Sequence, residues 1–202
     1  MKVFFPLRNS FFFFLPLAAI FFSCVSPRVT EESASPRCSR DLTGTGIKSE
    51  KQLADFFASR NPDYPYEDVL ELAALYIKEG ADEHINSDVA FVQMCLETGC
   101  LRFGRIVTAD MHNYCGLGSQ SQLERGASFE TAELGVRAHI QHLQAYATDE
   151  SVPLTKELVD PRYGWVHKAL SAKTIFDLSN QWAPEADYGD KLERLLTMLD
   201  AF

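Results

Sequence analysis

The sequence predicts an α+β domain that is mostly helical, preceded by an N-terminal segment outside the folded part. Three observations predict this architecture. Apolar residues recur at helical spacing over most of the chain after residue 49. A polar, glycine-containing stretch, residues 100–127, interrupts the helical pattern in the middle. The first two dozen residues instead combine a basic start with an apolar run.

The N-terminal segment is typical of an export signal. Lys2 and Arg8 accompany an apolar run of about a dozen residues, which suits a signal peptide and is short for a membrane-spanning helix. Ser23 followed by Cys24 has the shape of a lipoprotein cleavage site. Residues 1–23 are therefore predicted to be a lipoprotein signal peptide and Cys24 the lipidated residue. A plain signal peptide and an uncleaved anchor are the alternatives. The expected protein is exported and membrane-anchored, in the periplasm or at the cell surface.

Residues 24–43 are predicted to be a flexible tether, because they are rich in Ser, Pro, Arg and Glu and have too few apolar side chains to fold. Residues 44–202 are long enough for one domain with one core. Without the signal, the chain carries 17 basic and 28 acidic residues, a net charge of −11. This acidity argues against nucleic acid and against electrostatic adhesion to anionic lipid, and it is compatible with a carbohydrate partner.

Three helices are predicted before the polar stretch. The first begins after Ser49 in a capping box and ends before Asn61 and a proline. The second spans residues 66–78, with Gly80 as its C-terminal cap. The third spans residues 87–99 and is apolar almost all round, which indicates a helix buried at the centre of the domain.

Three more helices are predicted after the polar stretch, at residues 131–147, 174–182 and 188–199. Residues 100–127 between the two groups are rich in Gly, Ser, Asn and Gln, and we expect them to form a small β or irregular lobe. A long irregular stretch inside a compact domain is more often functional than idle.

Beyond Cys24, the chain has four cysteines, at positions 38, 95, 100 and 115. Spacing does not fix a disulfide pairing. We expect buried free thiols rather than a bridge. No metal or cofactor is predicted, because no His or Cys pair has metal-ligand spacing in a supporting context. His139 and His142, three residues apart on one predicted helix, are expected to be structural.

Glu97 is a candidate catalytic residue on physical grounds. It lies in the last turn of the most apolar predicted helix, two residues before Gly99. Burial and the negative end of the helix dipole both raise the pKa of such a carboxyl group. A Glu that is protonated near neutral pH can act as the general acid of glycoside cleavage. The alternative is an exposed Glu at a frayed helix end, paired with Arg102.

Four segments resemble, in the same order, the motifs of the bacterial endo-β-N-acetylglucosaminidases, glycoside hydrolase family seventy-three. They are residues 85–99, which end in the E-[ST]-G motif of the catalytic helix; 112–118, similar to the N-x-F-G-[IL] loop; 129–143, similar to the helix that follows; and 181–189, similar to the closing W-A-x-x-x-x-Y element. The resemblance covers about residues 55–202. Cys115 stands where the family commonly has an aromatic residue.

The resemblance implies a lysozyme-like fold and a peptidoglycan hydrolase. Such an enzyme cleaves the β-1,4 bond after N-acetylglucosamine in the glycan strands of the cell wall, with Glu97 as the general acid. Asn113, Gly116 and Tyr188 match motif positions and are therefore expected to bind substrate, with Asn113 hydrogen-bonded to the acetamido group of the sugar. For Tyr188, packing of the final helix is the alternative. The alternative for Asn113 is a turn residue.

A second catalytic group is also needed. Glu133 is the preferred candidate, because it matches the acidic residue that opens the family's helix after the lobe, and Glu130 and Glu124 are alternatives. A route assisted by the N-acetyl group of the substrate needs no close second carboxylate. Tyr163 and Trp165 are candidates for stacking on sugars, although core packing is expected for both, as it is for Trp182.

Other functions fit the same motifs. A lytic transglycosylase shares the lysozyme-like fold and a single essential Glu. A non-catalytic wall-binding lipoprotein keeps the fold without turnover. Cleavage of glycoprotein glycans is a further alternative.

Overall fold

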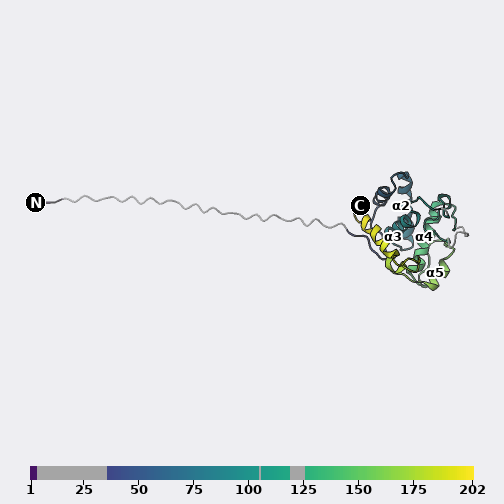
Figure 1. Cartoon of the computed structure of the whole chain (residues 1–202). Coiled ribbons are helices and arrows are strands. Elements are labelled where there is room, and N and C mark those ends of the chain that lie inside the picture. The colour runs from purple at the N-terminus through teal and green to yellow at the C-terminus, as the bar shows by residue number, and fades with distance from the viewer. Residues whose placement is uncertain (4–35, 105, 119–125) are drawn as a thin grey trace. The chain divides into compact units, whose positions relative to one another are not determined.

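The computed structural model describes residues 1–3, 36–104, 106–118 and 126–202. The chain divides into two units, Met1–Ala34 and Ser35–Phe202, and the second is the folded domain (Figure 1). Most of the predicted signal peptide, Cys24 and most of the predicted tether lie outside the described residues.

Helices make up most of the described domain. In chain order they are α1 (Glu50–Arg60), α2 (Tyr66–Asp82), α3 (Ser87–Thr98), the 3-10 helix η1 (Ala109–Met111), α4 (Ala132–Ala147), α5 (Tyr163–Ala169), the 3-10 helix η2 (Ile175–Leu178) and α6 (Tyr188–Leu199). The mostly helical class predicted from the sequence is confirmed. In the described parts of the chain, β structure is limited to isolated bridges, and the stretch between α3 and α4 is irregular apart from η1. None of the helices within these ranges has both the length and the apolar character needed to cross a membrane.

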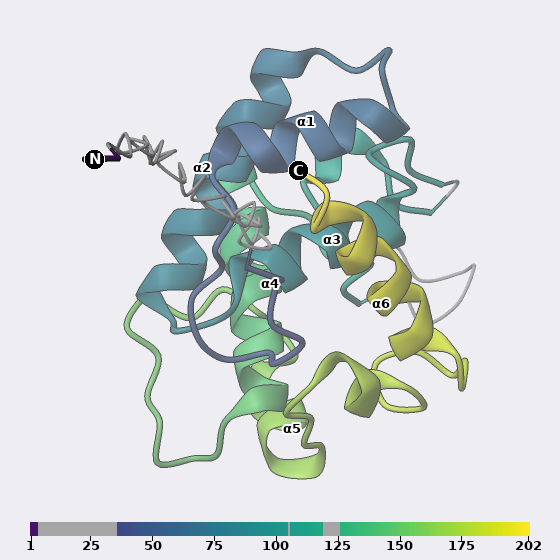
Figure 2. The same cartoon turned by 90° about the vertical axis from the view of Figure 1, so that its left-hand side faces the viewer.

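The helix α3 lies at the centre of the domain, as predicted. It contacts α1, α2, α4 and α6, which surround it in Figure 2. Every residue from Ser87 to Cys95 is buried. The side chain of Asn86 caps the first turn, and Gly99, in the left-handed conformation at φ +60°, ends the helix.

A buried carboxylate ties the start of α3 to the segment that leads into α1. Asp88 is fully buried and accepts the backbone N–H groups of Ile47 and Lys48 at 2.8 and 3.2 Å. A buried charge is tolerated only when hydrogen bonds replace its lost hydration. These two bonds therefore fix the position of the segment before α1 on the central helix.

The folded unit begins earlier than predicted. Cys38 and Leu42, which the sequence assigned to the tether, are buried in the main core. Arg40 forms an ion pair with Glu193 of α6, with Nε and Oε2 2.6 Å apart. The boundary predicted at residue 44 is therefore wrong, and residues 36–43 belong to the domain. Their few apolar side chains insert singly between distant elements, so local composition does not distinguish them from a tether.

Two helix predictions differ from the structure. The helix α2 continues through Gly80, which is buried and is not a cap. A Cβ on this residue would lie 2.7 Å from the carbonyl oxygen of Ile85, so the glycine serves a close approach. The helix predicted at 174–182 is only the single turn η2. The chain leaves it at Ser179, and Asn180 adopts a left-handed conformation at φ +61° that a helix cannot continue through.

The helix α5 was not predicted. It has seven residues, of which only Val166 is buried, so it has no apolar stripe. The cysteines Cys38, Cys95, Cys100 and Cys115 are buried and unbridged.

Gly135 in α4 lets the irregular stretch after α3 pack against that helix. A Cβ at this position would overlap the carbonyl oxygen of His112. We expect Gly135→Ala to lower the free energy of unfolding by about 1–3 kcal/mol, the usual cost of overpacking a rigid contact. Urea unfolding measures the change.

Gly164→Ala is the matched control, because nothing lies within 4 Å of a Cβ at position 164 in α5. It should leave stability unchanged or raise it by up to ~1 kcal/mol through helix propensity. Identical unfolding curves for the Gly135 variant and the wild type would mean that the segment around His112 can move away from α4 without a loss of stability.

Candidate active site

Glu97 opens into a pocket of about 470 Å³ at the C-terminal end of α3. Cys115 and Gly116 form one wall of the pocket, and the segment 182–185 with the first turns of α6 forms another. Segments far apart in the sequence therefore meet around this carboxyl group. Of the predicted site residues, the structure brings Glu97, Gly116 and Tyr188 together here.

Both hydrogen bonds to the Glu97 carboxyl group reach the same oxygen. The indole N–H of Trp182 donates to Oε1 at 2.9 Å, and the hydroxyl group of Tyr188 donates to Oε1 in a short contact. Oε2 faces Gly116, where an added Cβ would lie 4.0 Å away. Gly116 also has a positive φ of +68°, so a residue with a side chain would strain the backbone at this point.

Arg102 does not pair with Glu97. Its guanidinium group donates to the carbonyl oxygens of Gly99 and Arg60 at 3.0 and 2.9 Å. It therefore satisfies free carbonyl groups near the ends of α3 and α1, and the alternative ion pair considered from the sequence is not formed.

The pKa of Glu97 is raised, in the direction that the sequence predicts. Glu97 as a residue is exposed at the pocket mouth, yet neighbouring groups surround its carboxyl group, and the resulting desolvation is the largest cause of the shift. The hydrogen bonds from Tyr188 and Trp182 act in the opposite direction, and the negative charge of Glu185 adds to the rise. The net effect favours the protonated acid.

A row of buried hydrogen bonds leads to Glu97 from the far side of the core. The Tyr76 hydroxyl lies 2.9 Å from Nδ1 of His139, and Nε2 of His139 lies 3.1 Å from Oε1 of Gln93. Nε2 of Gln93 donates to the Tyr188 hydroxyl at 2.9 Å. Desolvation, with a smaller contribution from His142, lowers the pKa of His139 to about 3, so its imidazole is neutral at physiological pH.

The amide of Gln93 sets the direction of this row. Because its nitrogen donates to Tyr188, its oxygen must accept a hydrogen bond from the N–H at Nε2 of His139. Nδ1 of the neutral ring then accepts from the Tyr76 hydroxyl. The Tyr188 hydroxyl thus accepts a hydrogen bond from Gln93 and donates one to Glu97. Gln93 and Tyr76 were not predicted as site residues, because nothing in their helices sets them apart from core positions.

Trp182 is not a pure core residue, contrary to the prediction. It is half-buried, and its ring packs against His139, His142 and Tyr146 at centroid distances of 5.8, 5.0 and 5.6 Å. His142 in turn bonds to the buried Asp160 at 2.7 Å. Both histidines therefore support Trp182. Among the described residues, no cluster of three His, Cys, Asp or Glu side chains is placed to hold a metal ion.

Asn113 holds the loop rather than lining the pocket. It is fully buried. Its amide nitrogen donates to the carbonyl oxygens of Leu117 and Ala127, both at 2.9 Å, and its oxygen accepts the N–H of Leu117 at 2.9 Å. With its polar atoms engaged inside the loop, Asn113 has the contacts of the turn residue that was the alternative, and its predicted sugar contact stays a prediction.

Glu133 lies outside the Glu97 pocket. Its side chain is 45% exposed and pairs with Lys78 at 3.0 Å and with Arg137 at 3.2 Å. Both cations also bind the buried Glu79. Burial alone would raise the pKa of Glu79, but the hydrogen bonds from Arg137 and Lys78 outweigh it and lower the pKa to about 2. Glu133 is thus the exposed member of an ion-pair cluster that joins α2 to α4.

A different carboxylate, Glu185, lines the pocket together with Glu97. Sequence reasoning missed it, although it lies between Trp182 and Tyr188 in the motif that resembles the closing family element. Of the other sequence candidates, Glu130 is exposed and Glu124 lies outside the described residues.

Comparison with known proteins gives two matches. The model of a glucosaminidase family, described as mannosyl-glycoprotein endo-beta-N-acetylglucosaminidase, matches residues 73–201. An uncharacterized protein of Borreliella burgdorferi is 37% identical over 158 residues, which cover 78% of this chain and 76% of that protein. The family match includes Glu97, both walls of the pocket and the whole hydrogen-bonded row.

We expect Tyr188→Phe to raise the pKa of Glu97 further, because it removes a hydrogen bond that favours the charged form. Carbon-13 NMR titration of the labelled carboxyl group measures this shift. Tyr66→Phe, which removes a hydroxyl bonded to Asp55 at 2.8 Å, is the matched control and should leave the Glu97 titration unchanged. An unchanged or lowered pKa in the Tyr188 variant would contradict the assigned direction of the bond.

Proposed function

The chain belongs to the mannosyl-glycoprotein endo-beta-N-acetylglucosaminidase family, and we propose that it is a glycoside hydrolase that cuts the glycan strands of peptidoglycan. The bond cleaved is the β-1,4 bond after N-acetylglucosamine. The observation that carries this proposal is the carboxyl group of Glu97, which is held in an open pocket by Trp182 and Tyr188 and has a raised pKa.

Glu97 acts as the proton donor in this proposal. Two donors occupy Oε1, so the proton of the neutral acid is carried by Oε2, which faces the pocket beside Gly116. This proton passes to the glycosidic oxygen as its bond to the anomeric carbon breaks. The anomeric carbon, which becomes positively charged, then takes the oxygen of a water molecule, and the proton of this water passes to the second group, assigned below. The bonds from Tyr188 and Trp182 stabilise the carboxylate that Glu97 leaves behind.

A second group has to support the positive charge or activate the water. Glu185 is the other carboxylate among the residues that line the pocket, whereas Glu133 is held in a separate ion-pair cluster. We assign this role to Glu185. The N-acetyl group of the substrate is the alternative, since it can attack the anomeric carbon from within the same sugar and then needs no close carboxylate.

The anchoring of the protein is a further part of the proposal. The basic start, the apolar run and Cys24 support an exported lipoprotein that works on the wall from a membrane surface. The substrate is consistent with this placement, because peptidoglycan lies outside the cytoplasmic membrane.

We expect Glu97→Gln to lower turnover of purified peptidoglycan by roughly 10²–10⁴-fold, the usual contribution of a general acid. The fold should be retained, and its thermal midpoint at pH 7 should be equal or higher, because the raised pKa means that the charged form is disfavoured in the folded state.

Product analysis by mass spectrometry tests the proposed reaction in the same digest. A reducing N-acetylglucosamine end supports the hydrolase, and a 1,6-anhydro end would identify a lytic transglycosylase instead. Full activity in the Glu97 variant, or no turnover by the wild type, would overturn the proposal and favour a wall-binding protein.

Glu185→Gln and Glu133→Gln separate the candidates for the second group. We expect the Glu185 variant to lose turnover roughly 10-fold or more, since it removes a charge beside the reacting carbon, while KM changes little. The Glu133 variant should keep near-normal turnover and lose only stability. Full turnover in both variants would assign the second role to the N-acetyl group of the substrate.

A further inference from the structure

Two further pockets adjoin the Glu97 pocket. One, of about 600 Å³, shares Leu96 and Lys191 with it. The other, of about 250 Å³, shares Cys115, Gly116 and Trp182 with it. The shared residues place the two further pockets next to the Glu97 pocket, each against a different part of its lining, and we refer to the three together as the groove. A groove of this kind suits a polymer that extends to both sides of the cleaved bond.

The two outer parts of the groove differ in chemistry. The smaller pocket contains the rings of Tyr146, Trp165 and Trp182, and Trp165 is 57% exposed. The larger pocket, which we call the basic arm, is lined by four cationic side chains and by no acidic one: Arg60, Arg102, Lys191 and Arg194. Its volume is within the range of about 300–1,000 Å³ that is usual for ligand pockets.

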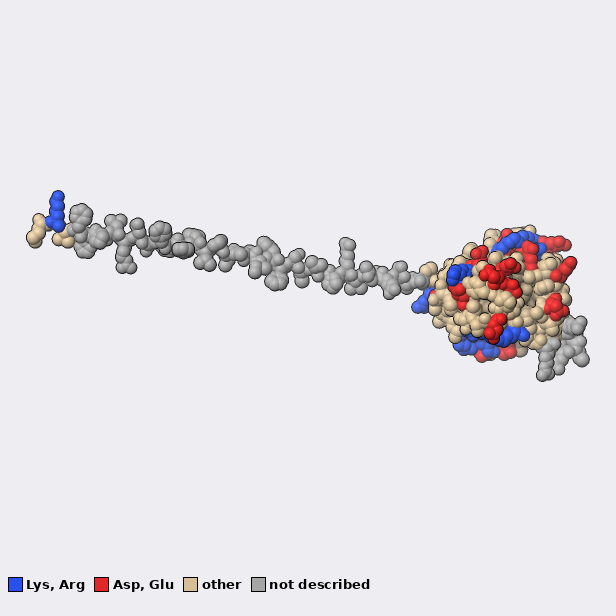
Figure 3. Space-filling model, turned by 90° about the horizontal axis from the view of Figure 1, so that it is seen from above, with Lys and Arg blue, Asp and Glu red and all other residues tan. Residues whose placement is uncertain are grey.

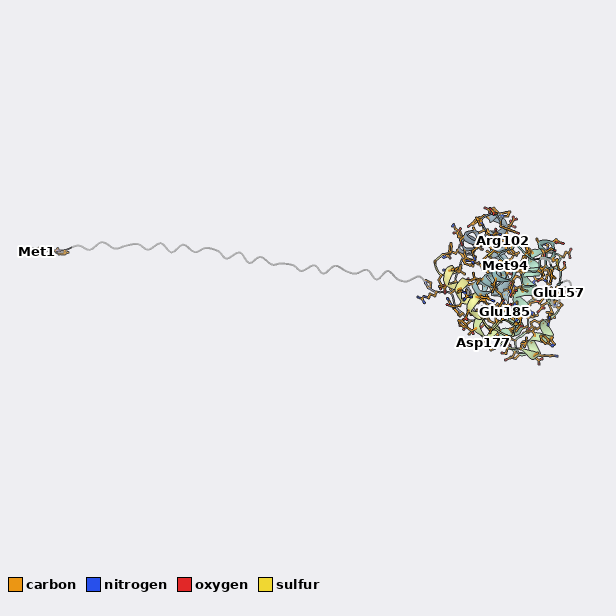
Figure 4. All side chains as sticks on the ribbon, in the orientation of Figure 1. Met1, Met94, Arg102, Glu157, Asp177 and Glu185 are labelled. Carbon is orange, nitrogen blue, oxygen red and sulfur yellow. The ribbon has the colours of Figure 1, made fainter. Side chains whose placement is uncertain are left out.

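The concentration of cations is unusual for this chain, whose net charge is −9. In Figure 3, basic side chains gather in a few patches on a surface that also carries many acidic ones. In Figure 4, Arg102 of the basic arm and Glu185 of the Glu97 pocket lie on either side of Met94 of α3. The smaller pocket has one arginine in its lining, Arg162, so the basic arm carries most of the positive charge of the groove.

The described carboxylates neutralise only part of the basic arm. Lys191 pairs with Asp187 at 3.1 Å. Arg60 and Arg102 bond to a methionine sulfur and two carbonyl oxygens. Both also lie close enough to the thiol of Cys100 to help lower its pKa. Within the described ranges, no carboxylate lies within ion-pair distance of Arg60, Arg102 or Arg194.

Stabilisation of helix ends does not explain the whole cluster. Arg60 ends α1, and Arg102 bonds near the end of α3, where a cation interacts favourably with the helix dipole. Arg194 lies in the middle of α6, is exposed and lines the same pocket. Three separate elements thus direct positive charge into one cavity next to the site of cleavage.

We propose that the basic arm binds the carboxylates of the peptide stems that project from the glycan strand. This inference rests on the proposed function. In peptidoglycan, the sugar next to N-acetylglucosamine carries a peptide with several carboxylates, so a strand lying across Glu97 presents anions close to the cleaved bond. Arginine suits this role, because its guanidinium group binds a carboxylate through two parallel hydrogen bonds. The enzyme then selects stem-bearing strands in their charged form.

Charge-neutralised substrate tests this inference. Soluble strands with intact stems are first acetylated on their free amines, and half of the preparation is then converted to methylamides at its carboxylates. Both preparations keep the same sugars and the same bonds. The full chain in its wild-type form should cleave the charged strands with a kcat/KM roughly 10-fold higher, and raised salt should reduce the difference.

The variant Arg60→Gln/Arg194→Gln should lose this preference, with a lower kcat/KM on charged strands and an unchanged value on methylamide strands. Arg37→Gln/Lys168→Gln is the matched control, because it removes the same charge from two exposed residues outside the groove. Thermal unfolding checks that each variant is folded.

Three outcomes would overturn the inference: equal cleavage of both preparations by the wild type, an equal loss on both in the groove variant, or the same selective loss in the control. Cleavage of methylamide strands by the wild type and its loss in Glu97→Gln report separately on the proposed function. The two ideas can therefore fail independently.

Discussion

The hydrogen bond from Tyr188 to Glu97 is the contact on which the geometry of the site depends. It joins the start of α6 to the end of α3 across 91 positions of sequence. Its direction is set by Gln93 and His139, and so by α3 and α4, and the row begins at Tyr76 of α2. Four helices are thus aligned by one set of buried donors and acceptors. A network of this kind is rigid only when every member is satisfied, because an unpaired buried polar group is costly.

Opposing effects are balanced at Glu97. Desolvation and the charge of Glu185 raise its pKa, and the bonds from Tyr188 and Trp182 lower it. The net rise means that desolvation and the charge of Glu185 together outweigh these two hydrogen bonds. This balance keeps the acid protonated more of the time and still stabilises the carboxylate that forms when the proton leaves.

The walls of the pocket are positioned by residues that never reach it. Asn113 closes the loop that carries Gly116 through three hydrogen bonds of 2.9 Å. Gly135 of α4 allows His112, the residue before Asn113, to pack on this helix. The cluster of Glu79, Lys78 and Arg137 joins α4 to α2. The residues that line the pocket and the residues that support it are therefore different, even where both belong to one motif.

The helices with a clear periodic pattern, the family and the direction of the Glu97 pKa shift followed from the sequence alone. A capping box at Ser49, a left-handed glycine at position 99 and the apolar stripe of α6 are local signals, and local physics is enough to interpret them. The short helix α5 and the packed segment 36–43 lack such signals, since their stability comes from distant partners. Only the tertiary structure decided that Glu185 rather than Glu133 shares the pocket of Glu97, that Asn113 faces inward, and that cations from three elements line one cavity. Each of these facts depends on which distant segments meet in the fold, and the spacing of residues along the chain does not determine the distance between such segments in space.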